Sequence, residues 1–379
     1  MQRTPLALLN LLHEKTRLIV AIAGVAFAVL LIFMNLGFQG ALLATTVTFY
    51  EQLQADIFLT SPESLEISST KAFPRTRLVQ IAGVEGVERA MPLYMEYLLW
   101  RNPETRISRA MFVFGINPQD PVFGMPELQT RAAQQVLETP NTVLIDRLSR
   151  EEFGPQTVGL ETEADRRRVT IGGQYTLGGG FAADGTLIMS DQNFIRFFAP
   201  RPFSQINLGL IQVESGANVD AIATTLRRLL PADVQVLTRR EMIQNDLQFW
   251  LQTTAIGFIF TLGVIVSFIV GTVIVYQILY TDIRDHMTEY ATLKAMGYSG
   301  RYLFGVVLQE AVILAIAGFV PGWVVAVGLY RLTREATNLP MIMTVNRLVL
   351  VLALTVVMCS LSGLISVRRA VTADPAEVF

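Results

Sequence analysis

The sequence predicts an α-helical membrane protein with four transmembrane helices and an α+β domain inserted between helices 1 and 2. Three observations support this prediction. Four long apolar segments occur in the chain, one near the N-terminus and three close to the C-terminus. A stretch of mixed composition, residues 55–240, separates the first segment from the others. The chain of 379 residues is 51% hydrophobic and only 16% charged, a balance that is unusual for a soluble protein of this length.

Each apolar segment is long enough to cross a bilayer, whose hydrocarbon core requires about 20 helical residues. Residues 18–50 and 247–281 contain no charged side chain, and both runs exceed that length. Only Glu310 interrupts the third segment. Because the first run is too long for a signal peptide and no small-residue cleavage site follows it promptly, we predict an uncleaved membrane anchor.

The lysines and arginines of the short connections set the orientation, because cytoplasmic loops carry an excess of these residues. Eight occur on one side: Arg3, Lys15, Arg17, Arg284, Lys294, Arg301, Arg368 and Arg369. The other side has three: Arg331, Arg334 and Arg347. The predicted order is therefore a cytoplasmic segment at 1–17, transmembrane helix 1 and stalk at 18–54, an external domain at 55–240, stalk and transmembrane helix 2 at 241–280, a cytoplasmic loop at 281–302, transmembrane helix 3 at 303–330, a short external loop at 331–347, transmembrane helix 4 at 348–367 and a cytoplasmic C-terminus at 368–379.

The external domain is predicted to mix strands and helices. Short segments rich in β-branched or aromatic residues predict strands at 97–100, 111–116, 143–145, 169–171, 186–189, 208–213 and 234–237. Apolar spacing predicts helices at 76–87, ending in a turn, and at 219–230, with Asn218 as N-cap. We interpret the acidic stretch 151–165 and the arginines after it as a solvated loop, and the glycines at 172–173 and 178–180 as a turn or flexible hairpin.

Few residues in this chain could carry chemistry. No GxxxxGK[ST] string is present, so the chain lacks the usual phosphate-binding loop for ATP. The single cysteine, Cys359, allows no disulfide within one chain, and two histidines, His13 and His286, argue against a histidine-based metal or catalytic centre. We therefore expect no catalytic residue, no metal and no bound cofactor, although an active site made of carboxylates alone stays open.

Glu310 is the one ionisable residue inside a predicted span, and such residues are costly in a membrane. It has two interpretations. It follows Arg301 by about two helical turns, so it could occupy a water-accessible position near the cytoplasmic boundary. Alternatively, it could couple neighbouring helices or line a substrate path.

The cytoplasmic loop contains a short amphipathic segment. Ile283, Met287, Tyr290 and Ala291 recur at helical spacing on one face, and Gly297 is placed to end the helix. Such a helix could be a mere connector, or it could lie on the membrane and offer a docking surface to a cytoplasmic partner.

Residues 289–297, E-Y-A-T-L-K-A-M-G, resemble the signature E-[IY]-[GA]-x-L-[KR]-A-[LM]-G of FtsX/MacB-type ABC transporter permeases. Residues 79–87 and 368–379 resemble two further motifs of that family, and its topology of one span, a large external domain and three spans is the same. The end of the chain and Asn338-Leu-Pro340 resemble the DevC subfamily of cyanobacterial exporters. The resemblance implies a MacB/FtsX-like (type VII ABC) fold.

The resemblance also implies a coupling site and partners. A permease homodimer would pair with two copies of a separate DevA/MacB-like ATPase, which binds the ATP. The coupling residues would be Glu289, Tyr290, Ala291, Thr292, Leu293, Lys294, Ala295, Met296 and Gly297. Within them, Leu293 and Met296 are candidates for apolar docking, and Glu289 and Lys294 for polar register. The apolar face could instead rest on lipid and leave the polar face to the ATPase.

By the same resemblance, the mechanism is transmission of ATP-driven motion through two stalk helices to the external domain. A DevB-like membrane-fusion adaptor and a TolC-like outer-membrane channel would complete an export route for a hydrophobic or amphiphilic substrate such as a glycolipid. The location would be the inner membrane of a bacterium of cyanobacterial type, with the large domain in the periplasm. Two alternatives stay open, an FtsX-like regulator of a cell-wall hydrolase and a LolC/E-like lipoprotein extractor. A membrane enzyme is a third, weakened by the lack of catalytic groups.

Overall fold

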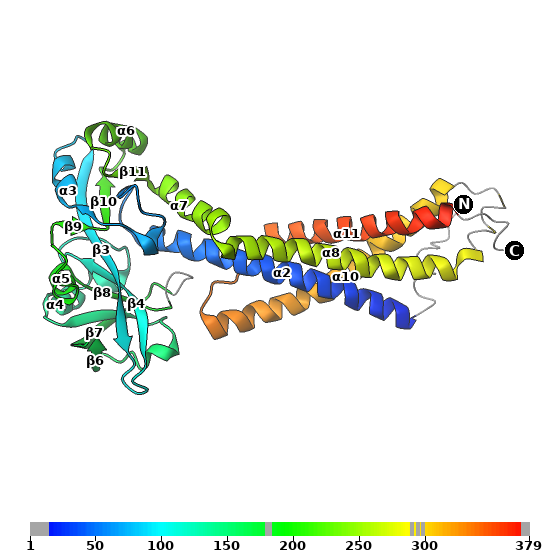
Figure 1. Cartoon of the computed structure of the whole chain (residues 1–379), viewed down its shortest axis with the longest axis horizontal. Coiled ribbons are helices and arrows are strands. Elements are labelled where there is room, and N and C mark those ends of the chain that lie inside the picture. Colours follow the sequence, from blue (N-terminus) through cyan, green and yellow to red (C-terminus); the bar gives the residue numbers. More distant parts are fainter. Residues whose placement is uncertain (1–14, 179–183, 289–291, 293–295, 297–299, 373–379) are drawn as a thin grey trace. The chain divides into compact units, whose positions relative to one another are not determined.

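The computed structural model describes residues 15–178, 184–288, 292, 296 and 300–372 (Figure 1). The chain divides into two compact units. The helical unit comprises residues 1–41, 255–335 and 341–379, and the sheet unit comprises residues 42–254 and 336–340. The predicted insertion of one domain between the first and second spans is therefore the division that the structure shows.

Four long helices dominate the chain, and each is long and apolar enough to cross a membrane. They are α2 (Lys15–Gln52), α8 (Ala255–Asp285), α10 (Gly300–Thr337) and α11 (Val345–Thr372). All four predicted spans lie within these helices. Helix α10 continues to Thr337, well beyond the predicted end of span 3 at residue 330. The charged residues of its last turns are helical as well. The predicted external loop at 331–347 is correspondingly shorter.

Small residues allow the four helices to pack closely, as is typical of membrane proteins. Gly318 and Gly322 of α10 face Val25 and Val29 of α2, and a Cβ atom on Gly322 would lie 2.7 Å from the carbonyl oxygen of Ala26. Larger residues at either glycine would therefore separate α10 from α2.

Hydroxyl groups join α8 and α11. The Ser362 hydroxyl donates to the Thr272 carbonyl oxygen at 2.8 Å. The Ser366 hydroxyl lies 3.4 Å from the carbonyl oxygen of Tyr276. Each hydroxyl also lies within hydrogen-bond distance of a carbonyl oxygen of its own helix, so its single proton always has an acceptor without water.

The sheet unit contains a nine-stranded sheet among its described residues, in the order β11-β1-β10-β3-β4-β8-β5-β7-β6. The strands are β1 (Ile57–Thr60), β3 (Val87–Arg101), β4 (Ser108–Ile116), β5 (Thr142–Asp146), β6 (Glu161–Ala164), β7 (Arg167–Tyr175), β8 (Thr186–Ser190), β10 (Leu208–Val213) and β11 (Gln235–Thr238). β2 (Phe73–Pro74) pairs separately with β9 (Gln205–Ile206). Only the β4–β8 and β5–β7 pairs are parallel in this described sheet.

Strand β3 belongs to two parts of this sheet. Its first half pairs with β10 and its second half pairs with β4. Near its end, Trp100 also pairs with Ala164 of β6, which closes β3, β4, β8, β5, β7 and β6 into a ring of pairings. One long strand therefore joins an open sheet to a closed one.

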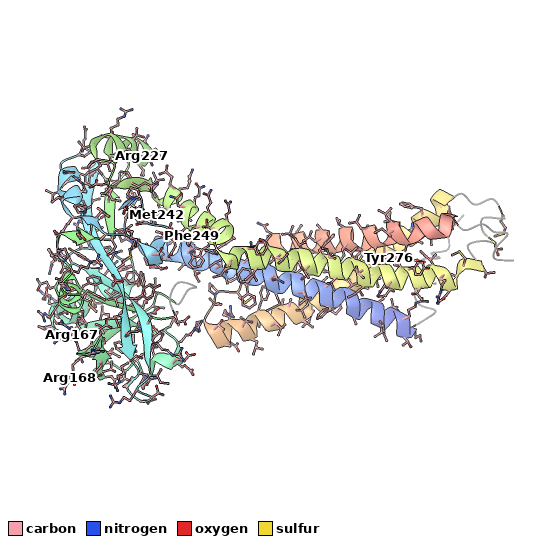
Figure 2. All side chains as sticks on the ribbon, in the orientation of Figure 1. Arg167, Arg168, Arg227, Met242, Phe249 and Tyr276 are labelled. Atoms are coloured by element: carbon pink, nitrogen blue, oxygen red, sulfur yellow. The ribbon has the colours of Figure 1, made fainter. Side chains whose placement is uncertain are left out.

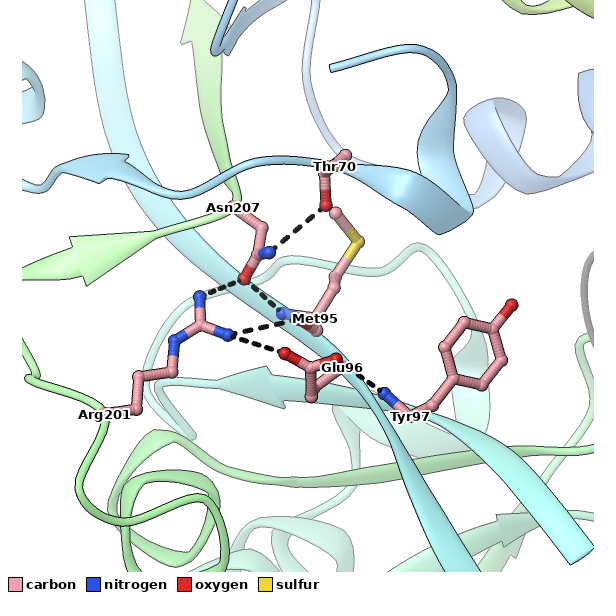
Figure 3. A network of polar contacts seen from close by, with 6 residues as sticks. All are labelled: Thr70, Met95, Glu96, Tyr97, Arg201 and Asn207. Carbon is pink, nitrogen blue, oxygen red and sulfur yellow. Dashed lines mark hydrogen bonds and ion pairs between the residues drawn. The ribbon is translucent and has the colours of Figure 1, made fainter. Parts of the chain in front are cut away.

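Asn207 stabilises β3 where it changes partner (Figure 3). Its side-chain oxygen accepts hydrogen bonds from the Met95 N–H at 2.8 Å and from Arg201 Nη2 at 2.5 Å, and its amide nitrogen donates to Thr70 Oγ1 at 3.2 Å. Arg201 also forms an ion pair with Glu96 at 3.4 Å. The side chain thus supplies an acceptor at a point where the strand ladder is interrupted, since an unpaired buried N–H is costly.

Short helices cover the sheet and connect its strands. They are α3 (Thr76–Ile81), α4 (Arg131–Glu138), α5 (Asp191–Phe197), α6 (Val219–Leu229) and α7 (Arg239–Gln248), with short 3₁₀ turns at Ile67–Ser69, Pro126–Gln129 and Glu151–Phe153 and a π-helical turn at Phe249–Thr253. Buried apolar side chains form two clusters. Along β3 they alternate, because Tyr94, Leu98 and Trp100 belong to one cluster and Leu93 and Met95 to the other.

Most predicted elements of this unit are confirmed. The predicted strands all overlap observed ones, and α6 begins after Asn218, whose side chain accepts a hydrogen bond from the Ala221 N–H at 3.1 Å. The helix predicted at 76–87 is shorter, because it stops at Ile81 and a turn follows.

Two interpretations of loops are wrong. The stretch 151–165 contains β6, whose alternating burial places Thr162 and Ala164 inward and the charged side chains outward. Gly172 and Gly173 lie within β7 rather than in a turn, and a Cβ atom on Gly172 would collide with Val136 of α4. The first glycine is therefore required by close packing of α4 on the strand.

Candidate functional site

Most of the predicted coupling segment lies outside the described residues. Glu289, Tyr290, Ala291, Leu293, Lys294, Ala295 and Gly297 belong to this group. Of the segment, the structure describes Thr292 and Met296. The Thr292 hydroxyl donates to the Thr288 carbonyl oxygen at 2.8 Å, and the Met296 N–H donates to that of Thr292 at 3.0 Å. Both bonds join residues four apart, which is the spacing of an α-helix, and the Met296 side chain is 64% exposed.

A charged cluster lies directly before this segment, where α8 ends. Arg17, in the first turn of α2, contacts Asp285 at 3.1 Å and Asp282 at 3.7 Å. The ring of His286 lies 3.9 Å from the carboxylate of Asp282. Two carboxylates at the C-terminal end of a helix oppose its dipole, and the arginine offsets them. We call Arg17, Asp282, Asp285 and His286 the basal cluster.

Apolar contacts surround the basal cluster. Ile283, next to Asp282, is buried against Val307 of α10 and Val367 of α11, and Met287 and Tyr302 pack on the same group. The last turn of α8 therefore contacts side chains of the two other C-terminal helices as well as Arg17 of α2.

Glu310 is buried inside the helical unit, with 0% of its surface exposed. It lies three residues after Val307 and four before Leu314, which are both buried, so it shares the inward face of α10. This burial goes against a water-accessible position. A role in coupling helices or lining a substrate path stays a prediction.

The sheet unit holds a second cluster, which joins the last turns of α2 to α7. The Tyr50 hydroxyl donates to Asp246 Oδ2 at 2.7 Å, and the backbone N–H of Ile67 lies 3.3 Å from the same oxygen. Tyr50 is 0% exposed and Asp246 is 1% exposed, while the nearby Glu66 is also buried. We call Tyr50, Asp246, Glu66 and the Ile67 N–H the anchor cluster.

The anchor cluster perturbs the acid at its centre. Burial raises the pKa of Asp246 to about 7, the charge of Glu66 adds to that effect, and the hydrogen bonds from Tyr50 and Ile67 oppose it. Asp246 therefore titrates near neutral pH. Because an ionised carboxylate without a cation is costly in a buried site, its protonated form stabilises this contact.

Arg239 adds a further link between the chain entering the sheet unit and the chain leaving it. Its guanidinium donates to the carbonyl oxygens of Leu53 and Ala55 at 3.1 and 2.9 Å. Its backbone N–H donates to the carbonyl oxygen of Asp56 at 2.9 Å. Helix α7 starts here with a capping box, in which Thr238 and Glu241 satisfy each other's backbone N–H groups.

A further attachment comes from the connection between α10 and α11, since residues 336–340 belong to the sheet unit. Asn338 has a φ of 56°, and its side-chain amide lies 3.4 Å from the carbonyl oxygen of Leu148. Asn338 was singled out from the sequence, but this contact was not predicted.

A groove of about 490 Å³ lies between α6, β11 and α7. Arg227, labelled in Figure 2, borders it. Its only charged lining residues, Arg227 and Glu241, form an ion pair with each other at 2.5 Å. Arg227 also donates to the Val236 carbonyl oxygen at 3.0 Å. The groove therefore offers little charge to a ligand.

Among the described residues, no group of three or more His, Cys, Asp or Glu side chains could hold a metal ion. Sequence reasoning missed the basal and anchor clusters, because each pairs residues far apart in the chain. The T-R-R-E string at 238–241 was the one local signal that could have placed the start of α7.

The chain is similar to known proteins, in one region or along nearly its whole length. Residues 261–375 match the family FtsX-like permease C-terminal. An uncharacterized ABC transporter permease of Mycobacterium bovis (strain ATCC BAA-935 / AF2122/97) is 23% identical over 98% of this chain and 98% of its own length. Uncharacterized ABC transporter permeases of Mycobacterium tuberculosis strains CDC 1551 and H37Rv match with the same identity and coverage. The chain thus carries an FtsX-like permease region and is similar to ABC transporter permeases along nearly its whole length.

Two solved structures resemble part of the chain. The periplasmic region of MacB from Actinobacillus actinomycetemcomitans aligns with a TM-score of 0.38 at 12% identity, covering 51% of this chain and 92% of that one. The extracellular domain of YknZ, a noncanonic ABC-type transporter from Gram-positive bacteria, aligns with a TM-score of 0.36 at 16% identity, covering 48% of this chain and 100% of that one.

Proposed function

We propose that this chain is the permease subunit of an ATP-driven export system and carries motion from a separate cytoplasmic ATPase to its external sheet unit. The observation that carries the proposal is the match of residues 261–375 to the FtsX-like permease region, which includes the loop between α8 and α10. The missing phosphate-binding loop supports a division of labour in which the partner subunit binds and hydrolyses ATP. The permease itself then needs no cofactor.

The basal cluster supplies a route for the motion. A push on residues 289–297 would act on the last turn of α8, which Arg17 ties to the first turn of α2. Both helices are continuous over their length, 31 residues in α8 and 38 in α2, and an α-helix resists compression because every turn is hydrogen-bonded to the next. One cytoplasmic contact would therefore move two long helices together.

The anchor cluster would receive that motion. Tyr50 belongs to the last turn of α2, and its hydrogen bond to Asp246 fixes that turn to α7. Since Arg239 also binds the backbone at Leu53 and Ala55, the entry and exit of the sheet unit would move as one piece.

The finer assignments rest on the motifs of the sequence. Residues 368–379 and Asn338-Leu-Pro340 support a DevC-like permease homodimer in a bacterial, cyanobacterial-type inner membrane. Its partners would be a DevA/MacB-like ATPase, a DevB-like adaptor and a TolC-like outer-membrane channel. Its substrate would be hydrophobic or amphiphilic, such as a glycolipid, as the resemblance to that subfamily implies.

Leu293→Asp tests the coupling assignment. In the chain reconstituted with its co-encoded ATPase, a charge at this apolar docking position should weaken ATPase binding by at least about tenfold, as loss of one buried leucine contact does. Deletion of residues 289–294 should abolish the binding and the substrate-stimulated part of ATP hydrolysis. Leu65→Asp, which changes an exposed leucine of the sheet unit, is the matched control.

Two outcomes would redirect the proposal. If ATPase binding and stimulated hydrolysis survive both changes, residues 289–297 are not the coupling segment. If coupling is lost as expected, but vesicles containing the pair move no amphiphile and the pair activates a cell-wall hydrolase instead, the chain is a regulator and not an exporter.

A further inference from the structure

An arginine-rich surface lies at one end of the sheet unit and has no role in the coupling scheme. Two strand ends contribute to it, residues 99–109 around the β3–β4 turn and residues 163–168 around the β6–β7 turn. Together they contain six arginines, namely Arg101, Arg106, Arg109, Arg166, Arg167 and Arg168, and three carboxylates, Glu104, Glu163 and Asp165. The excess of positive charge is unlike the chain as a whole, whose net charge is −2.

Backbone contacts hold the two turns together. The Leu99 N–H donates to the Asp165 carboxylate at 3.0 Å, and the Asp165 N–H donates to the Leu99 carbonyl oxygen at 3.1 Å. Asp165 and Arg166 have φ values of 47° and 66°, as in the two-residue turns that favour hairpins. The arginines therefore lie on two turns that are hydrogen-bonded to each other.

One carboxylate neutralises only part of this charge. Glu163 forms an ion pair with Arg101 at 2.5 Å, and the pKa of Glu163 is lowered first by that contact and then by Arg106 and Arg168. Three arginines thus surround a single glutamate.

The other arginines are open to solvent. Arg106, Arg109, Arg166, Arg167 and Arg168 are exposed, and within the described residues none of them forms an ion pair. Arg167 and Arg168 are marked in Figure 2 at the margin of the sheet unit. Beside them, Leu99 is 54% exposed and Ile107 is 57% exposed. The surface therefore combines several unneutralised guanidinium groups with two large aliphatic side chains.

We propose that this surface, which we call the arginine end, docks on a lipid surface that carries anionic phosphate headgroups. One guanidinium group can donate two parallel hydrogen bonds to phosphate oxygens. Exposed aliphatic side chains can enter the headgroup region of the lipid. Several exposed guanidinium groups on two neighbouring turns suit a surface that carries many anionic headgroups. The inference goes beyond the proposed function, and rests on it only for placing the sheet unit outside the cytoplasm.

The test uses the whole chain in nanodiscs of phosphatidylcholine and measures its binding to separate vesicles. Wild type should bind vesicles containing phosphatidylglycerol and not vesicles of phosphatidylcholine alone, and salt should weaken the binding. Arg106→Gln/Arg167→Gln/Arg168→Gln should weaken it by roughly a hundredfold, because each arginine near an anionic surface contributes about fivefold. Leu99→Ser/Ile107→Ser should weaken it several-fold further.

The matched control is Arg131→Gln/Arg196→Gln/Arg228→Gln, which removes three exposed arginines elsewhere on the sheet unit. The proposal fails if this control loses as much binding as the first triple variant, or if wild type shows no preference for phosphatidylglycerol. It also fails if, at matched ionic strength, polyglutamate displaces the vesicles where sodium chloride does not, which would indicate an acidic protein partner. Displacement by inorganic phosphate under the same control would indicate a free anion. Leu293→Asp should leave vesicle binding unchanged, so failure of the coupling scheme would be seen separately.

Discussion

The two ends of helix α2 are held by different kinds of contact. Near its first turn, Arg17 forms ion pairs with Asp282 and Asp285, and the Asp285 side chain is 42% exposed. In its last turn, Tyr50 meets Asp246 through a hydrogen bond that is closed to solvent. Exposed ion pairs are weak, screened by salt and quickly exchanged, whereas a buried hydrogen bond surrounded by aromatic packing is hard to break.

This difference suits a device that receives force at one end and delivers it at the other. In the proposed function, the coupling point adjusts as the ATPase partner closes and opens, and the pair of Arg17 with the partly exposed Asp285 can rearrange more readily than a buried contact. An attachment point must not yield, and the anchor cluster holds its two helices by packing as well as by a hydrogen bond. The following changes test this contrast, from the largest expected effect to the smallest.

Tyr50→Ala should have the largest effect. It empties a fully buried aromatic site that contacts Phe58, with ring centroids 5.6 Å apart, and it removes the side-chain donor of the Asp246 carboxyl. Removal of a buried aromatic ring costs roughly 3–5 kcal/mol. Thermal unfolding of the sheet unit, followed by Trp100 fluorescence, should shift downward accordingly. Tyr50→Phe keeps the ring and should cost only about 1–3 kcal/mol. Equal losses for both variants would mean that the hydroxyl, and not the packing, makes the anchor.

Asp246→Asn should show how protonation supports the anchor. The pKa of Asp246 is about 7 in the folded chain, above its ordinary value of 3.8. Between pH 3.8 and pH 7 the folded state therefore keeps a proton that the unfolded state has released. The stabilisation is therefore complete below about pH 4 and is lost as pH rises through 7.

The size of that loss has an upper limit of roughly 4 kcal/mol, from the difference between the two pKa values. Asn cannot ionise, so Asp246→Asn should be more stable than wild type at pH 8 and close to it at pH 4. The measurement is the free energy of unfolding of both proteins across this range. Glu51→Gln, which changes an exposed carboxylate beside Tyr50, should show no such crossover. A constant difference between Asp246→Asn and wild type at every pH would contradict the assignment.

Arg17→Gln should have the smallest effect on stability, about 1–2 kcal/mol, because the Asp285 side chain is 42% exposed although Asp282 is buried. Its effect on coupling should be larger than its effect on stability, since it separates the first turn of α2 from the end of α8. We expect less substrate-stimulated ATP hydrolysis with little change in melting temperature. High salt should bring wild type toward the variant. If both quantities fall together, the basal cluster holds the fold and does not transmit motion.

The sequence predicted the membrane spans well because a bilayer imposes a length and a composition that few other environments require. It predicted α6 through a local signal, the cap at Asn218. Strand β6 was missed because Glu161 and Glu163 conceal a short alternation in which only Thr162 and Ala164 face inward. Charged residues on the outer face of an edge strand look like a loop until their neighbours are known.

The clusters were missed for a different reason. Tyr50 and Asp246 are 196 residues apart, and neither stands in a motif that marks it as one of a pair. Glu310 was noticed because a carboxylate stands out against apolar neighbours, but its burial depends on which face of α10 packs inward. Periodicity predicts that a face is buried. It does not predict which distant residue will meet it.

The pairing of Trp100 with Ala164 has a further consequence for how this unit behaves among many copies of itself. A closed ring of strands has no open backbone at the junction of β3 and β6, where a second chain could otherwise add a strand. The strand at the remaining end of the described order, β11, is only four residues long, and Arg227 already occupies the outward carbonyl oxygen of Val236. The described strands therefore leave little open sheet edge at these two places for strand exchange or aggregation.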